Sequence, residues 1–391
     1  MRQKGAVGWF RHDITHRGIT AWILAFVLLT FYVVLYWGGD TFTLGDGGLT
    51  LVIPDWITQL AAWTAETFDV PRKHINKWTI YGALYSVAIV GGGIYMMRKY
   101  RHNNYQLVRT GVVMFTQVSF AFSIPIILKV IGQPEYYFSY LWPLKIEYMF
   151  PTTLARLPIY MAAYSVIGSM VFVPLLSIVY GKRWYCSWIC GCGGLANTFG
   201  EPWRHLSSKK NAAWRFEKVS IHTTLVISFL LTGMVALSFV MGGSSPELTE
   251  STRTFQKGYF FLVSAVLSGI VGVAAYPIGG TRIWCRYFCP MAALIGLTQK
   301  FGRFRVTVKE DMCISCGLCS KYCEMGIDVR AYAQRNQSFV RASCVGCGMC
   351  AEVCPRGVLR LENKWDKDPQ ELHMDSLLSE SYKHQPHRKA A

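Results

Sequence analysis

Six apolar segments of about twenty residues place the strongest constraint on how this chain of 391 residues folds. Each is long enough to cross the hydrocarbon layer of a bilayer as a helix. The predicted spans are 19–37, 78–97, 108–131, 158–180, 221–241 and 259–278. Hydrophobic residues make up 52% of the chain and charged residues only 16%, which is more apolar than ordinary soluble proteins. The sequence therefore predicts an all-α polytopic membrane bundle.

The distribution of positive charge predicts the orientation of this bundle. With the amino terminus inside, the short inner segments carry fourteen Lys and Arg residues and the outer segments carry seven. Positive residues are enriched on the cytoplasmic side of membrane proteins. We therefore expect both termini in the cytoplasm, at a bacterial inner membrane, and an amphipathic helix over 51–67 on the outer surface. The net charge of +17 is explained in this way, so nucleic acid is not an expected partner.

Two cysteine runs near the carboxyl end carry the clearest chemical signal. Residues 313–323 read CISCGLCSKYC and residues 344–355 read CVGCGMCAEVCP, so each contains C-x2-C-x2-C-x3-C. Three closely spaced thiolates bind one [4Fe–4S] cubane, and the fourth cysteine of each run ligates the other cluster. Zinc sites and disulfide scaffolds usually show other spacings. The predicted ligand sets are Cys313, Cys316, Cys319 and Cys354 for one cluster, and Cys344, Cys347, Cys350 and Cys323 for the other.

A second constellation is a basic–aromatic–C-x3-C unit that occurs twice, each time just after a predicted span. The segments GKRWYCSWIC (181–190) and TRIWCRYFC (281–289) align cysteine with cysteine and arginine with arginine. On a helix, a C-x3-C pair places both sulfurs on one face, one turn apart. Two such pairs supply four thiolates, enough for a third cluster or another metal at the inner membrane surface. The candidate ligands are Cys186, Cys190, Cys285 and Cys289, with Arg183, Arg282 and Arg286 as flanking cations that offset negative charge.

Other interpretations of these twin units remain open. Four reduced structural cysteines at helix ends, or a reversible disulfide, would use the same residues. Cys192 aligns with Met291 and is either a spare thiol or a substitute ligand.

Twin C-x3-C motifs on a membrane core, followed by a two-cluster ferredoxin, resemble the NapH/NosR/CcoG group of membrane ferredoxins. The resemblance covers about 158–362 and implies inner-membrane electron transfer between the quinone pool and periplasmic redox proteins, with a copper-reducing branch. The chain departs from the usual motifs at two positions. Gly191 replaces the proline after the first C-x3-C pair, and Glu324 replaces the proline after the first ferredoxin run, whereas Pro355 follows the second.

These observations lead to one main functional hypothesis and two alternatives. The main one is an electron-transfer subunit of a quinol-dehydrogenase-like oxidoreductase, which relays electrons between a quinone or a partner redox subunit and its clusters in a respiratory complex. The first alternative is a copper or metal reductase, or a cofactor-assembly protein, which the histidines of the tail (His373, His384 and His387) would suit. The second is an anchoring subunit without chemistry of its own.

The predicted domain organisation follows from the motifs. Residues 1–18 form a basic cytoplasmic amino terminus and 19–290 the six-helix membrane domain. Residues 291–362 form a small α+β ferredoxin domain, and 363–391 form a charged, flexible tail.

Overall fold

The computed structural model describes residues 9–44, 49–241 and 246–363. Within these residues, six helical spans are long and apolar enough to cross a membrane, which confirms the predicted polytopic bundle. They are α2 (Ile19–Trp37), α4 (Lys77–Lys99), Asn104–Val130, Ile159–Tyr180, α12 (Asn211–Val240) and Pro246–Ala274. The last two begin earlier than their apolar stretches, because polar turns at 211–220 and 246–258 continue the same helices.

Three of the spans are interrupted by π-helical turns. α5 (Asn104–Val118) continues through η1 (Ser119–Ser123) into α6 (Ile124–Val130), and α8 (Ile159–Ile167) continues through η3 (Gly168–Phe172) into α9 (Val173–Tyr180). Pro125 and Pro174 lie two residues after the ends of these turns. A proline ring clashes with the carbonyl four residues earlier, and a widened turn removes that clash. In the sixth span, α13 (Pro246–Tyr259) passes into the longer π-helical segment η5 (Phe260–Ala274).

The segment between the first two spans differs from its prediction. Only Trp56–Thr67 is helical (α3), whereas Leu49–Val52 forms strand β2, which pairs antiparallel with β1 (Thr41–Leu44). The predicted helix over 51–67 is therefore too long at its start. Pro54 disfavours helical backbone in the preceding residue, and Asp55 caps α3 by accepting a hydrogen bond from the Thr58 N–H at 3.3 Å.

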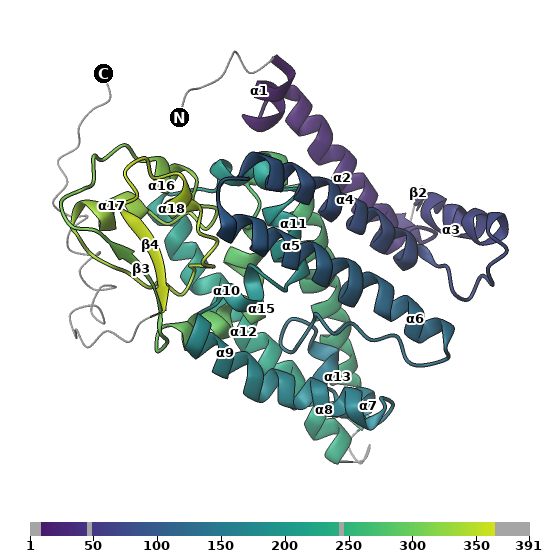
Figure 1. Ribbon diagram of the computed structural model, residues 1–391. Coiled ribbons are helices and arrows are strands. Elements are labelled where there is room, and N and C mark those ends of the chain that lie inside the picture. The colour runs from purple at the N-terminus through teal and green to yellow at the C-terminus, as the bar shows by residue number, and fades with distance from the viewer. Residues whose placement is uncertain (1–8, 45–48, 242–245, 364–391) are drawn as a thin grey trace.

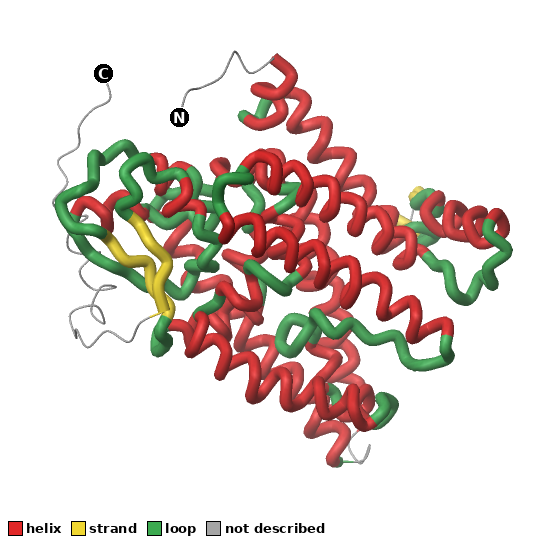
Figure 2. The backbone as a smooth tube through the Cα atoms, in the orientation of Figure 1, coloured by secondary structure: helices red, strands yellow, loops and turns green. Residues whose placement is uncertain are grey.

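The ferredoxin half is small and lies at one end of the bundle (Figure 1). Strands β3 (Phe304–Val308) and β4 (Leu359–Asn363) pair antiparallel, and α16 (Leu318–Lys321), α17 (Val329–Gln334) and α18 (Met349–Glu352) complete it. Figure 2 shows these two strands beside short helical turns. The predicted fold class, an α-helical membrane bundle with a small α+β ferredoxin unit, is confirmed.

The ends of the spans show which elements share a side. The short helix α1 (Trp9–Thr15), at the start of α2, lies at the same end of the spans as the ferredoxin half (Figure 1). The β1–β2 hairpin and α3 lie at the opposite end, with η2 (Ile146–Met149) and α7 (Pro151–Leu154) in the long loop before α8. The predicted tail, with its three histidines, falls outside the described residues.

Candidate metal centres

The two cysteine runs of the ferredoxin half share one local backbone. The residue before the second cysteine of each run is left-handed, with φ of 57° at Ser315 and 58° at Gly346. The glycine after that cysteine is left-handed too, with φ of 73° at Gly317 and 76° at Gly348. Each glycine starts a one-turn helix, α16 or α18, that carries the third cysteine. Two left-handed residues so close together curl the chain into a loop that turns three thiols toward one centre.

The fourth cysteine of each run is also held in the same way. The backbone N–H of Ile327 donates to Sγ of Cys323 at 3.4 Å, and that of Val358 donates to Sγ of Cys354 at 3.4 Å. A hydrogen bond to sulfur favours the thiolate, which is the form that binds iron.

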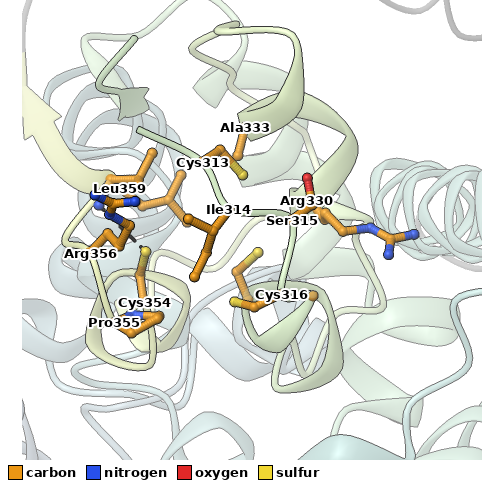
Figure 3. A pocket seen from close by; sticks show the side chains of 13 residues that line it. Cys313, Ile314, Ser315, Cys316, Arg330, Ala333, Cys354, Pro355, Arg356 and Leu359 are labelled. Atoms are coloured by element: carbon orange, nitrogen blue, oxygen red, sulfur yellow. Dashed lines mark hydrogen bonds between the residues drawn. The ribbon is translucent and has the colours of Figure 1, made fainter. Parts of the chain in front are cut away.

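The first predicted ligand set surrounds a pocket (Figure 3). Cys313, Cys316, Cys319 and Cys354 all line it, and its volume is about 360 Å³ when the open solvent at its mouth is included. Three of these cysteines come from the first run and one from the end of the second, as the crossed ligation pattern predicts. The donor set and the space between the thiols fit a cubane cluster.

The second predicted ligand set is more deeply enclosed. Burial raises the pKa of Cys323 to about 11, and the nearby Cys347 thiol adds to the rise. Burial likewise raises the pKa of Cys344 to about 12, with contributions from Cys323 and Cys347. Cys350 is influenced by all three of these thiols. Cys323 therefore lies close enough to the second run to interact electrostatically with its thiols.

The thiols are spread apart rather than clustered on a point. Among the described residues, which include all thirteen cysteines, no three His, Cys, Asp or Glu side chains lie close enough to hold one metal ion. A single tetrahedral zinc needs ligands about 2.3 Å from one centre. A cubane instead separates its thiolates over the corners of a cube, so it does not require such a close group.

The second run is fastened to the membrane half through its backbone carbonyls. Tyr105 of α5 donates to the Gly346 oxygen at 2.8 Å, and Gln106 donates to the Cys347 oxygen at 2.9 Å. Ser187 donates to the Val345 oxygen at 2.6 Å. By contrast, Cys316 in the first run is the one exposed cysteine among the thirteen. The two cluster sites thus face different surroundings.

The twin C-x3-C units do repeat in three dimensions, but neither is a continuous helix. In the first unit, α10 (Arg183–Cys186) ends at its first cysteine and α11 (Gly191–Asn197) starts after its second. In the second unit, the π-helical turn η6 (Trp284–Phe288) is followed by α15 (Pro290–Gln299). The prediction of one helix per pair was wrong. Cys190 and Cys289 are instead extended N-cap residues, because the chain reverses before Gly191 and Pro290.

All four cysteines of the twin units lie in one buried core, with 3–5% of each side chain exposed. Sγ of Cys289 accepts a hydrogen bond from the Ala292 N–H at 3.4 Å, at the start of α15. The pKa of Cys190 is lowered to about 7, chiefly by the neighbouring Cys192 thiol, with the amides of Gly193 and Cys192 also contributing. Cys192 therefore acts on Cys190, a role that its lack of a counterpart in the repeat did not reveal.

The first unit lies deeper than predicted. Tyr85, near the middle of α4, donates to the Gly191 oxygen at 2.8 Å, and Gln117, in the middle of the third span, donates to the Ile189 oxygen. Tyr185 donates at 2.9 Å to the oxygen of Ser139, in the loop between the third and fourth spans. The chain after α9 re-enters the bundle, so this unit is not confined to the inner surface.

The three flanking arginines have separate roles. Nη1 of Arg282 donates to the Cys186 oxygen at 3.3 Å and contacts Sγ of Cys285 at 3.7 Å, so it joins both units. Arg183 lies over the ring of Phe304 at 5.0 Å. Arg286 pairs with Glu217 at 2.6 Å. Of the three, Arg282 is the cation that contacts a thiol of the twin units.

Other buried cations near the thiols were missed by sequence reasoning. Lys182 and Arg204 are fully buried, and Lys182 lowers the pKa of Cys186 and Cys344, although burial raises both overall. Arg109, also fully buried, donates to the Cys347 oxygen at 3.2 Å. Its position inside the predicted span 108–131 was a usable signal, since charged residues in spans usually face a functional interior.

These cations have unused donors. Nε and Nη2 of Arg109, Nε of Arg204 and Nε of Arg282 are buried without a hydrogen-bond partner among the described residues. Unpaired buried donors are costly unless an acceptor or an opposite charge is present. Anionic thiolate-ligated clusters on the neighbouring cysteines would supply that charge, so these residues also fit the predicted cofactor.

Six helices long and apolar enough to span a membrane, together with these cysteine sites, are typical of multi-pass, ferredoxin-type proteins with iron–sulfur binding domains. A 4Fe-4S dicluster domain model matches residues 306–361. A 4Fe-4S binding domain model matches twice, at 162–210 and 260–309, and these segments contain the two C-x3-C units. One model matching both segments supports the internal repeat.

The comparison with curated proteins confirms the resemblance to membrane ferredoxins. The chain is 27% identical over 164 residues to the methylamine utilization ferredoxin-type protein MauN of Methylorubrum extorquens, covering 41% of this chain and 54% of the relative. It is 26% identical over 178 residues to YccM of Escherichia coli (44% and 48%), and 24% identical over 165 residues to the regulatory protein NosR of Stutzerimonas stutzeri (40% and 22%). The match thus spans about half the length of MauN and YccM. No solved structure matches the chain significantly.

Proposed function

We propose that this protein carries single electrons between a soluble redox partner and a quinone or partner redox subunit in the membrane. Two [4Fe–4S] clusters would be bound by the crossed ligand sets of the ferredoxin half, and a third by Cys186, Cys190, Cys285 and Cys289. When bound, such clusters supply one-electron redox chemistry over a wide range of potentials. The supporting observation is the order of the three cysteine sets.

That order runs from solvent into the bundle. Cys316 is exposed, and Cys319 of the same set is close enough to influence Cys350 of the second set. The second set adjoins the twin units through Lys182, which acts on both Cys344 and Cys186. The side chains around the inner sets keep water away and balance negative charge with cations, which lowers the cost of holding charge in a buried place.

The end of this series inside the membrane domain, at the twin C-x3-C units, lies near polar side chains of the bundle. Tyr85 and Gln117 bond to each other at 3.1 Å and to the backbone on either side of Cys190. These groups, in the middle of the membrane domain, are where we place the exchange with a quinone or a membrane partner. We further propose that the ferredoxin half lies in the cytoplasm at the bacterial inner membrane, since the inner segments carry the excess of positive charge.

Iron and sulfide analysis of the purified protein, combined with EPR, tests the proposal. Three clusters predict about twelve iron atoms per chain, whereas two predict about eight. The double variant Cys186→Ser, Cys285→Ser should lose about four irons and one EPR signal, leaving the ferredoxin signals in place. Protein with about eight irons, unchanged in that variant, would refute the third cluster. Absence of iron in protein purified without oxygen would refute the function as a whole.

Metal handling is the second candidate, and the Cys192 thiol next to Cys190 favours it. A fifth thiol beside the twin units could bind a thiophilic ion such as Cu(I) during reduction. An assay of Cu(II) reduction by the pre-reduced protein, with Cys192→Ala beside the wild type, distinguishes the two functions. Copper reduction that depends on Cys192 supports metal handling, and copper turnover absent from both proteins excludes it.

A further inference from the structure

The carboxylate that follows Cys323 is held entirely by the membrane half. Glu324 is fully buried, and its Oε1 accepts a hydrogen bond from Arg282 at 3.0 Å. Its Oε2 lies 3.2 Å from Nη1 of Arg204, in η4 (Glu201–Leu206). Its backbone oxygen accepts a hydrogen bond from Ser207 at 2.6 Å. Pro355, at the equivalent position after the second run, is exposed.

Arg282 extends this contact to the twin units. The same guanidinium that binds Glu324 also donates to the Cys186 oxygen and contacts Sγ of Cys285. Glu324 and Arg282 therefore link Cys323, a predicted ligand of the second ferredoxin cluster, to Cys285, a predicted ligand of the third.

We propose that Glu324 is a positioning residue that docks the ferredoxin half on the twin C-x3-C centre and tunes the potentials of the two centres it joins. This inference rests on the proposed electron-transfer function. It assigns a purpose to the replacement of the usual proline, which has neither a charge nor a backbone donor.

The charges around Glu324 explain why its carboxylate is needed. Arg109, Arg204 and Arg282 are all at most 1% exposed, and Glu324 is the carboxylate that pairs with two of them. Removing one member of a buried ion pair leaves an uncompensated charge, which is strongly destabilising. The negative charge of Glu324 also opposes the addition of an electron nearby, while each arginine favours it.

Removing a negative charge and removing a positive charge from this bridge should therefore shift the reduction potentials in opposite directions. Glu324→Gln removes a negative charge, so the second ferredoxin cluster and the twin centre should both become easier to reduce. Arg204→Gln removes a positive charge from the same bridge, so the second cluster should become harder to reduce. The reduction potential of the cluster at Cys316 should change least in both variants, because this cluster lies on the solvent side of the ferredoxin half.

A matched control comes from another carboxylate at the same junction. Glu352 of α18 pairs with His102 at 2.5 Å and with Asn103, both in the loop between α4 and α5. It therefore helps to dock the ferredoxin half without pairing with the arginines beside the thiols. Glu352→Gln should loosen docking but leave the twin centre at its wild-type potential, because Glu352 pairs with none of the arginines beside those thiols. Glu324→Asp, which keeps the charge, should restore potentials toward wild type.

The test is an EPR-monitored redox titration of the wild type and of the four variants, with iron content measured for each. Opposite shifts of the second cluster in Glu324→Gln and Arg204→Gln, with a twin-centre shift in Glu324→Gln that is absent from Glu352→Gln, support the proposal. Shifts of the same sign, or no shift in either, overturn it. If Glu324→Gln does not retain its clusters, the direction of the shift in Arg204→Gln decides, with Glu324→Asp expected at wild-type potentials.

A second measurement separates failure of this inference from failure of the proposed function. Hydrogen exchange of residues 306–361 reports docking whether or not iron is bound. If the wild type contains no iron, the proposed function fails. Glu324→Gln should nevertheless exchange faster than wild type across this region, and unchanged exchange would show that Glu324 does not dock the ferredoxin half.

Discussion

The two cysteine runs of the ferredoxin half have nearly the same backbone but opposite surroundings. Both carry left-handed residues at matching positions and an amide-to-sulfur bond at the fourth cysteine. The first run ends in Glu324, which is buried against the membrane half, yet the loop that holds Cys316 is exposed. The loop of the second run is pinned by α5 and Ser187. Local structure thus provides two equivalent cluster sites, and docking makes one the outer site and the other the inner site.

The largest expected difference between the sites concerns electron delivery. Cys347→Ser and Cys316→Ser should each remove about four irons per chain, since a cubane needs its thiolates. With Cys347→Ser, the twin centre should no longer be reduced by a soluble donor, because the inner site joins the two ends. With Cys316→Ser, a small chemical reductant should still reduce the twin centre through the inner site.

Rapid-freeze EPR after mixing with the reductant measures this difference. Equal rates of twin-centre reduction in both variants would contradict the assigned order of the sites.

A smaller difference is expected from matched glycine substitutions. A Cβ at Gly348 would lie 2.9 Å from the Tyr105 ring, whereas a Cβ at Gly317 would meet its nearest atom, on Arg330, at 3.8 Å. Both changes strain a left-handed backbone, at a cost of about 1–2 kcal/mol. Gly348→Ala should cost about 1–3 kcal/mol more, because it also overpacks the interface with α5.

Thermal unfolding of the two variants, followed at the cluster absorbance, tests this expectation. Equal losses of stability would show that the Tyr105 ring moves aside for the added Cβ at Gly348 without a free-energy cost.

The smallest effect should come from a single hydrogen bond at the inner site. Tyr105→Phe removes the donor to the Gly346 oxygen and should weaken docking by about 1 kcal/mol. Ser320→Ala is the control, because the Ser320 hydroxyl donates to Asp328 and accepts from the Arg330 N–H at the start of α17, within the ferredoxin half. Hydrogen exchange of residues 344–350 should quicken in the first variant only. Similar exchange in both would argue against α5 as the clamp of the inner site.

The sequence-based predictions were accurate where a feature depends on residues close together in the chain, and less accurate where it depends on distant ones. The six spans and the cysteine runs were predicted closely, since helix length and ligand spacing are local properties. The helix over 51–67 was placed too early, although Pro54 was visible. Each C-x3-C pair was expected on one helix, but the chain turns before Gly191 and Pro290. Helical spacing alone does not show where a helix stops.

The two departures from the usual motifs acquire a meaning only in the fold. A Cβ at Gly191 would lie 2.6 Å from the Tyr140 hydroxyl and 2.8 Å from that of Tyr85, so a proline has no room there. Glu324 faces Arg204 and Arg282, which precede it by 120 and 42 residues. No local pattern links such distant positions.

The sequence by itself determined the chemistry of this protein: a membrane bundle, thiolate ligands at cubane spacing and a repeated C-x3-C unit. These features are carried by residues close together in the chain, where apolar length and short spacings act directly. The tertiary structure alone decided which cluster site faces the solvent, how deep the first C-x3-C unit lies and which buried charges join the centres. Those properties arise from contacts between segments that are far apart in the chain. In such buried contacts a charge or a hydrogen-bonding group is stable only when its partner is present.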